Sequence, residues 1–171
     1  FADGAEKIVC PDGFEIVKYW DPIYLAAYEN FIAALAQYYD GDPRVEFIQI
    51  GIGKFGETQP CDDRDDAYVQ AALTQDAPIY EGVVNTDYTW AFVVNDIVDI
   101  YARHFVHMRL LLPNAPTFGL DKCGYRVWSE HALALGIGLF PANLLAIQQD
   151  VDYRGWPGRE GCGKFDPILD H

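Results

Sequence analysis

The stretch DPIYLAAYENFIAALAQYYDGDPRVEFIQIGIGKFGE, residues 21–57, predicts a helix, a tight turn and a strand in that order. Asp21 is a typical helix cap, and Pro22 suits the first helical turn. Apolar side chains then recur at helical spacing, at Leu25, Tyr28, Ile32, Leu35 and Tyr39. The sequence Asp-Gly-Asp-Pro at residues 40–43 ends this helix, and the apolar, β-branched run at 45–50 predicts the strand.

The rest of the chain continues this alternation. Its apolar spacing predicts helices at about residues 67–74, 89–105 and 125–135, and strands at 108–112, closed by Pro113, and at 144–148. Helices that alternate with strands indicate an α/β fold with parallel strands. Three strands are few for a complete doubly wound domain, but they suit the middle of a (β/α)8, or TIM, barrel. We therefore expect residues 1–171 to form a single α/β domain that is an incomplete TIM barrel.

The chain is strongly acidic, with 26 acidic and 12 basic residues and a formal charge of −14. This charge argues against nucleic acid as a partner, because phosphate contacts need a positive surface. No apolar run reaches the roughly 18 residues that cross a bilayer, so we expect no membrane partner. The 11 Tyr, 10 Phe and 4 Trp side chains supply flat apolar surfaces on which sugar rings stack. None of these features predicts the oligomeric state.

The four cysteines are Cys10, Cys61, Cys123 and Cys162, and none forms a Cys-x-x-Cys or Cys-x-x-His pair of a zinc site. Their even count is compatible with two disulfides and with four thiols. The chain begins at Phe1 rather than Met, which indicates a processed mature protein or a piece of a longer one. Together with the acidity, these features are compatible with a secreted protein.

The letters GIGKFG, residues 51–56, match the G-x-G-x-x-G pattern of dinucleotide-binding folds. Such a site requires a helix to begin at the third glycine, so that its N-terminus holds the pyrophosphate. Here Glu57 follows and Pro60 biases the chain away from helical angles, so we expect no nucleotide cofactor. Two interpretations remain. The glycines turn the chain and leave Glu57 as a solvated acid, or they clear space beside a Glu57 that lies beyond the carboxyl end of a strand, where parallel α/β folds place their chemistry.

The segment WDPIYLAAYENFIAALAQYYDGDPRVEFIQIGIGKFGE, residues 20–57, resembles clan A glycoside hydrolase barrels, especially β-galactosidase-like and related uncharacterised barrels. In that family a W-x-P-x-Y helix and a DP-x-V turn precede the fourth strand, which ends in a glycine- and aromatic-containing turn followed by Glu. The matching residues are Trp20, Pro22, Tyr24, Asp42, Pro43, Val45, Phe55, Gly56 and Glu57. The resemblance extends over about residues 18–60, and ALALGIGLFPANLLAI at 132–147 is loosely similar to the family's helix and sixth strand. It implies that the chain carries about strands 4 to 6 of a barrel.

The resemblance implies that Glu57 is the general acid/base of an enzyme that hydrolyses O-glycosidic bonds of a carbohydrate substrate, without a cofactor. Retention at the anomeric carbon requires a second carboxylate about 5 Å away, and the family carries this nucleophile on its seventh strand. The family typically has Asn before the catalytic Glu, whereas this chain has Gly56. A non-catalytic carbohydrate-binding barrel or pseudoenzyme is therefore the alternative function, and a purely structural α/β domain is a third.

Further residues near the predicted strand ends are candidates for substrate binding: Gln59, Asn143, Asp150 and Trp156. Amide and carboxylate groups can hydrogen-bond sugar hydroxyls, and a loop tryptophan can stack on a pyranose ring. An ordinary structural role is the alternative for each of them. His104 and His107 are three residues apart, but no set of Asp, Glu or Cys converges on them in the sequence, so we expect no metal site.

Overall fold

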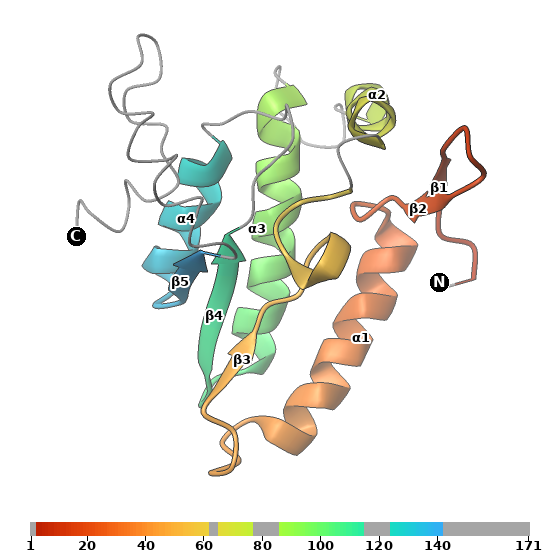
Figure 1. Cartoon of the computed structure of the whole chain (residues 1–171). Helices are drawn as coiled ribbons and strands as arrows, with labels where there is room; N and C mark the ends of the chain where they lie inside the picture. Colours follow the sequence, from red (N-terminus) through yellow and green to blue (C-terminus); the bar gives the residue numbers. More distant parts are fainter. Residues whose placement is uncertain (1–2, 62–64, 77–85, 115–123, 142–171) are drawn as a thin grey trace, which may run out of the picture.

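The computed structural model describes residues 3–61, 65–76, 86–114 and 124–141, and Figure 1 shows their arrangement. In chain order the described elements are β1 (Lys7–Val9), β2 (Glu15–Val17), α1 (Pro22–Tyr39), β3 (Phe47–Gln49), the 3-10 turn η1 (Lys54–Gly56), α2 (Asp66–Asp76), α3 (Thr86–His104), β4 (Arg109–Asn114), α4 (Gly124–Ala134) and β5 (Gly138–Pro141). None of these helices is long and apolar enough to cross a membrane.

The larger sheet consists of three parallel strands in the order β3–β4–β5. Ile48 pairs with Leu110, and Leu112 pairs with Leu139. Helix α3 precedes β4 and helix α4 precedes β5, as the long crossovers between parallel neighbours require. The predicted α/β fold with parallel strands is confirmed, whereas the described strands form an open sheet and no closed barrel.

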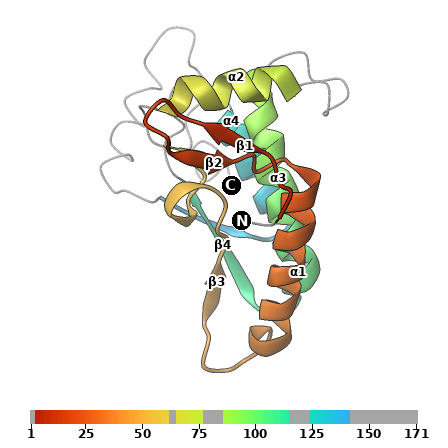
Figure 2. The ribbon, with the colours of Figure 1, turned by 90° about the vertical axis from the view of Figure 1, so that its right-hand side faces the viewer.

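Helices α1, α3 and α4 lie on one face of this sheet. Helix α3 packs between α1 and α4, and Figure 2 shows α1 and α3 on the same side of β3 and β4. On this side Ile48, Leu110 and Leu112 belong to the core or pack against it. Phe47 and Arg109, which are paired neighbours on the opposite face, are exposed. One face of the sheet is therefore free of described helices, and we call it the uncovered face.

Helix α3 is the centre of the core and buries the side that carries its apolar residues. Its buried side chains are Trp90, Ala91, Val93, Val94, Ile97, Val98, Ile100 and Tyr101. Asn95, Asp96, Asp99 and Arg103 lie on the other side, so α3 is an amphipathic helix with a wide apolar face. Trp128 of α4 and Leu112 of β4 complete this core, and each is at most 1% exposed.

A short antiparallel hairpin, β1–β2, precedes α1 and was not predicted. Its turn contains Pro11, Asp12 and Gly13, with Gly13 at φ +81° and the N–H of Phe14 donating to Asp12 Oδ1 (3.0 Å). Strands of three residues are too short for a polar–apolar alternation, and the Pro-Asp-Gly triplet is the signal that could have found them. The hairpin and α2 lie beyond the carboxyl end of β3 (Figure 1, Figure 2).

The third parallel strand, β5, precedes the predicted residues 144–148, which lie outside the described residues. A Cβ on Gly138 would lie 2.6 Å from Cδ2 of Leu111, so glycine permits a close contact between β5 and β4 although it is a poor strand former. Strand β4 also runs past Pro113. Its pairing with β3 ends at Leu111, so the missing N–H of Pro113 interrupts no bond to β3.

Helix α1 begins and ends where the sequence predicts. Asp21 Oδ1 accepts hydrogen bonds from the N–H groups of Ile23 (2.8 Å) and Tyr24 (3.0 Å), and its Oδ2 accepts one from the N–H of Glu6 (3.3 Å). Asp40, directly after the helix, accepts from three successive N–H groups ahead of β4, at distances of 2.9 to 3.2 Å. The two carboxylates thus tie α1 to the hairpin at one end and to the sheet at the other.

Replacing Asp21 with Ala should lower the free energy of unfolding by about 1–2 kcal/mol, because a buried helix cap loses its acceptor. Urea denaturation measures this loss. Asp12→Ala removes a carboxylate acceptor from an exposed turn and serves as the control, with an expected loss below about 0.5 kcal/mol. Equal losses in the two variants would contradict the capping role of Asp21.

Candidate functional site

The carboxyl end of β3 is held by tyrosines from two different helices. Tyr28 of α1 donates its hydroxyl to the carbonyl of Gly51 (2.5 Å), and the N–H of Gly51 donates to the hydroxyl of Tyr101 on α3 (3.1 Å). The two hydroxyl oxygens are 3.0 Å apart. Because the single hydroxyl proton of Tyr28 goes to Gly51, Tyr101 donates to Tyr28 and the three residues close a ring of hydrogen bonds, the Gly51 ring. Burial raises the pKa of Tyr28, which keeps its hydroxyl protonated.

Beyond this ring the chain folds back on itself in the glycine loop, residues 51–61. The N–H of Gly53 donates to the carbonyl of Glu57 (2.8 Å), and the N–H of Lys54 donates to the carbonyl of Gln59 (2.9 Å). A Cβ on Gly53 would lie 2.0 Å from the carbonyl oxygen of Gln59, so only glycine fits there. The turn η1 is three residues long and Glu57 after it is extended (φ −107°, ψ 175°), so the glycine loop offers no helix N-terminus to a pyrophosphate.

Glu57 lies within the glycine loop, directly after Gly56. Gln49 follows Phe47 by two positions and therefore shares that face. Its side-chain amide donates a long hydrogen bond (3.5 Å) to the carbonyl of Gly56, next to the half-buried Glu57. The space beside Gly53 is filled by the backbone of Gln59 and Pro60 in the same loop. This differs from the expectation that Gly53 clears space beside Glu57. The assignment of Glu57 as general acid/base stays a prediction.

Gln59 lies in a buried part of the glycine loop and is 8% exposed. The preceding residue, Thr58, is fully buried, and its carbonyl accepts a hydrogen bond from Nε1 of Trp90 (2.8 Å). The proposed contact of Gln59 with substrate stays a prediction. The other predicted substrate-binding residues lie outside the described residues: Asn143, Asp150 and Trp156.

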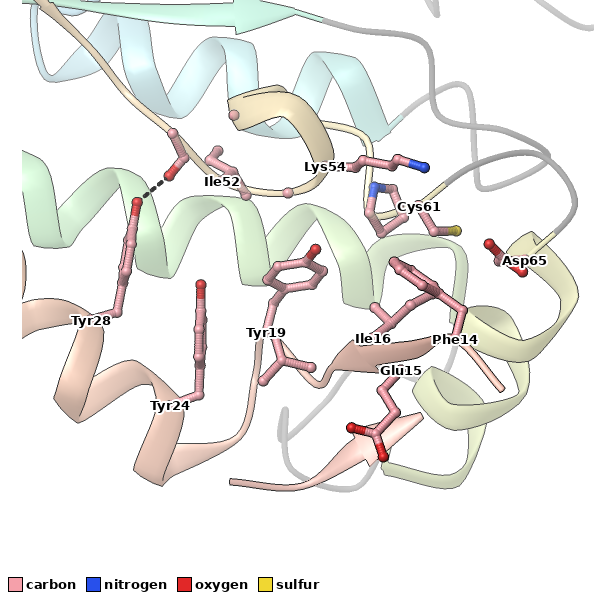
Figure 3. A pocket seen from close by; sticks show the side chains of 15 residues that line it. Phe14, Glu15, Ile16, Tyr19, Tyr24, Tyr28, Ile52, Lys54, Cys61 and Asp65 are labelled. Carbon is pink, nitrogen blue, oxygen red and sulfur yellow. Dashed lines mark hydrogen bonds between the residues drawn. The ribbon is translucent and has the colours of Figure 1, made fainter. Parts of the chain in front are cut away.

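A cavity of about 350 Å³ lies between the glycine loop and α1 (Figure 3). Its walls come from β2, the first half of α1, the glycine loop and the residue before α2. Among the side chains that the structure describes, four aromatic ones line it: Phe14, Tyr19, Tyr24 and Tyr28. Glu57 is not among its lining residues, although the preceding residue, Gly56, is. The sequence did not reveal this cavity, because part of its wall belongs to the unpredicted hairpin.

The tyrosines in this cavity pack against one another. Tyr24 stacks on Tyr28, with ring centroids 5.6 Å apart and planes at 11°, and Tyr19 meets Tyr24 edge-on at 5.8 Å and 81°. Burial raises the pKa of Tyr24 to about 12 and raises the pKa of Tyr19 as well. Both hydroxyls therefore keep their protons at neutral pH. Lys54 and Asp65 add charged groups to the lining.

The histidines of α3 and α4 contact carboxylates of neighbouring helices. His104 Nε2 lies 3.2 Å from Glu29 Oε1, and His131 Nε2 lies 2.7 Å from Asp99 Oδ1. Within the described ranges, no three His, Cys, Asp or Glu side chains gather as ligands of a metal ion. These histidines therefore connect helices: His104 joins α3 to α1, and His131 joins α4 to α3.

No protein-family model matches this chain, and no significant similarity to a curated protein or a solved structure was found. The similarity of residues 18–60 to glycoside hydrolase barrels therefore stays a prediction from the sequence. The structural features that bear on function are the glycine loop and the cavity at the carboxyl end of β3.

Gly53→Ala should lower the free energy of unfolding by about 2–3 kcal/mol, because its Cβ meets a backbone carbonyl that cannot move without breaking loop hydrogen bonds. Urea denaturation measures the loss. Gly13→Ala is the matched control: Gly13 has φ +81° but no neighbouring atom within 4 Å of the added Cβ, so only backbone strain of about 1 kcal/mol is expected. A smaller loss for Gly53→Ala than for Gly13→Ala would contradict the close approach in the glycine loop.

Proposed function

We propose that the carboxyl edge of the β3–β4–β5 sheet is the mouth of a glycoside hydrolase-like (β/α)8 barrel, and that Glu57 is its general acid/base. One observation carries this proposal: Glu57 follows β3 at the carboxyl edge of a parallel sheet whose strands lie in sequence order. TIM-barrel enzymes place their chemistry at this edge. Strands in sequence order are also what a barrel requires, whereas doubly wound sheets reverse their order at the binding crevice.

The uncovered face of the sheet supports the same proposal. In a TIM barrel the helices form an outer ring, and the opposite sheet face turns toward the barrel axis. Here α1, α3 and α4 form one layer, and Gln49 connects the other face to the carbonyl of Gly56. Glu57 comes next in the chain, in the fourth-strand position that the sequence resemblance implies.

The role of Glu57 in this proposal is proton transfer. In retaining hydrolysis, a carboxylic acid protonates the leaving glycosidic oxygen while a carboxylate about 5 Å away attacks the anomeric carbon. The first residue, now ionised, then removes a proton from the water that releases the sugar from the covalent intermediate. The resemblance places the nucleophile on a seventh strand, so this chain supplies the acid/base and the nucleophile comes from elsewhere in the barrel.

A non-catalytic carbohydrate-binding barrel is the second candidate function. The observation that favours it is Gly56, which stands where the family typically has an Asn that helps to orient the sugar. A barrel without this amide can still bind a sugar at the carboxyl ends of its strands, but it lacks the side chain that helps to orient the sugar for catalysis. Turnover and binding, measured on the same protein, separate the two candidates.

In the full-length protein, Glu57→Gln should lower kcat for an aryl glycoside by about 100-fold or more, because an amide supplies neither the acid nor the base. Added azide, a nucleophile that needs no general base, should restore part of the rate. Glu46→Gln is the matched control, since Glu46 is exposed and directly precedes β3.

Unchanged turnover in Glu57→Gln would eliminate Glu57 as the acid/base. A wild-type protein that binds glycosides but turns over none of them, with or without azide, would favour the carbohydrate-binding candidate.

A further inference from the structure

The cavity between the glycine loop and α1 takes no part in the proposed chemistry, because Glu57 does not line it. We propose that this cavity binds one neutral sugar ring, at a site separate from Glu57. Its volume of about 350 Å³ lies within the range of small-molecule sites, roughly 300–1,000 Å³. Its lining also has the composition of such sites, mostly aromatic and apolar with a few polar groups.

Two hydroxyl groups in the cavity are available to a ligand. Those of Tyr19 and Tyr24 have no hydrogen-bond partner in the part of the chain that the structure describes, whereas the hydroxyl of Tyr28 is held in the Gly51 ring. Figure 3 shows the hydroxyls of Tyr19 and Tyr24 directed toward the glycine loop, across the cavity. Both stay protonated at neutral pH, so each can donate one hydrogen bond and accept another. Sugar hydroxyls, which also donate and accept, complement them.

The apolar walls suit the carbon-bonded hydrogens of a pyranose ring. Phe14 is 48% exposed, so the cavity opens to solvent beside this ring. Farther inside, Ile16 and Ile52 are at most 5% exposed and add aliphatic surface. A ligand with one apolar face and a polar edge can therefore contact the walls and the tyrosine hydroxyls together.

The charges around the cavity favour a neutral ligand over an anion. Lys54 Nζ lies 6.0 Å from the centre of the Phe14 ring, where it occupies the position over an aromatic face that a cationic ligand would take. Asp65 and Glu15 line the same cavity, and the chain carries a formal charge of −14, so an anion is repelled.

The test is a titration of the full chain with the methyl glycosides of glucose, galactose and mannose. Calorimetry and ligand-observed NMR monitor the binding. At least one should bind saturably, and Tyr19→Phe and Tyr24→Phe should each raise its Kd by about two- to tenfold through loss of one hydrogen bond. Tyr38→Phe is the control, because Tyr38 is on the same helix as Tyr24, is 79% exposed and does not line the cavity. Its Kd should equal that of the wild type, and so should the Kd of Glu57→Gln at this site. Failure of the catalytic proposal therefore leaves this one standing.

Three results would overturn the proposal, given variants whose thermal unfolding matches the wild type. The first is no saturable binding of any of the three glycosides. The second is a Kd that neither tyrosine substitution changes. The third is tighter binding of phenol or choline than of all three sugars, which would assign the cavity to an aromatic or a cationic ligand.

Discussion

The Gly51 ring fixes the point at which β3 ends, and the glycine loop depends on it. Gly51 uses both its N–H and its carbonyl in this ring, and the two tyrosines come from α1 and α3. A buried polar group that loses its partner costs about 1–3 kcal/mol, so few alternative positions of Gly51 relative to these helices are accessible. Helices α1 and α3 therefore fix the position of Gly51, the residue at which the glycine loop begins.

From that point the glycine loop contacts both the cavity and the sheet. Its residues 51–54 and 56 line the tyrosine-lined cavity on either side of residue 55, and the carbonyl of Gly56 accepts the hydrogen bond from Gln49 on the uncovered face. The hydrogen bonds from the N–H of Gly53 to the carbonyl of Glu57 and from the N–H of Lys54 to the carbonyl of Gln59 hold the two halves of the loop together. The proposed acid/base and the proposed sugar cavity are therefore close together in the chain.

Local signals in the sequence were sufficient to predict the helices and the alternation of helices and strands from α1 onward. The cap at Asp21 and the apolar spacing after it predicted α1, and the alternation predicted the parallel sheet. Short elements were missed, because the strands of the hairpin have three residues each and β5 begins with Gly138. Contacts between distant residues were also missed: Gly51 meets Tyr101 50 positions away, and no local pattern encodes that pairing.

Hydrogen exchange at the amide of Gly51 measures the stability of the Gly51 ring. Tyr101→Phe keeps the ring that packs on Phe105 but removes the hydroxyl that accepts from this amide. Without this hydroxyl, exchange at Gly51 and along the glycine loop should be faster by about fivefold, which corresponds to the loss of one hydrogen bond, and exchange in the middle of α1 should be unchanged. Exchange at Gly51 that is as slow in Tyr101→Phe as in the wild type would contradict the central place of the Gly51 ring.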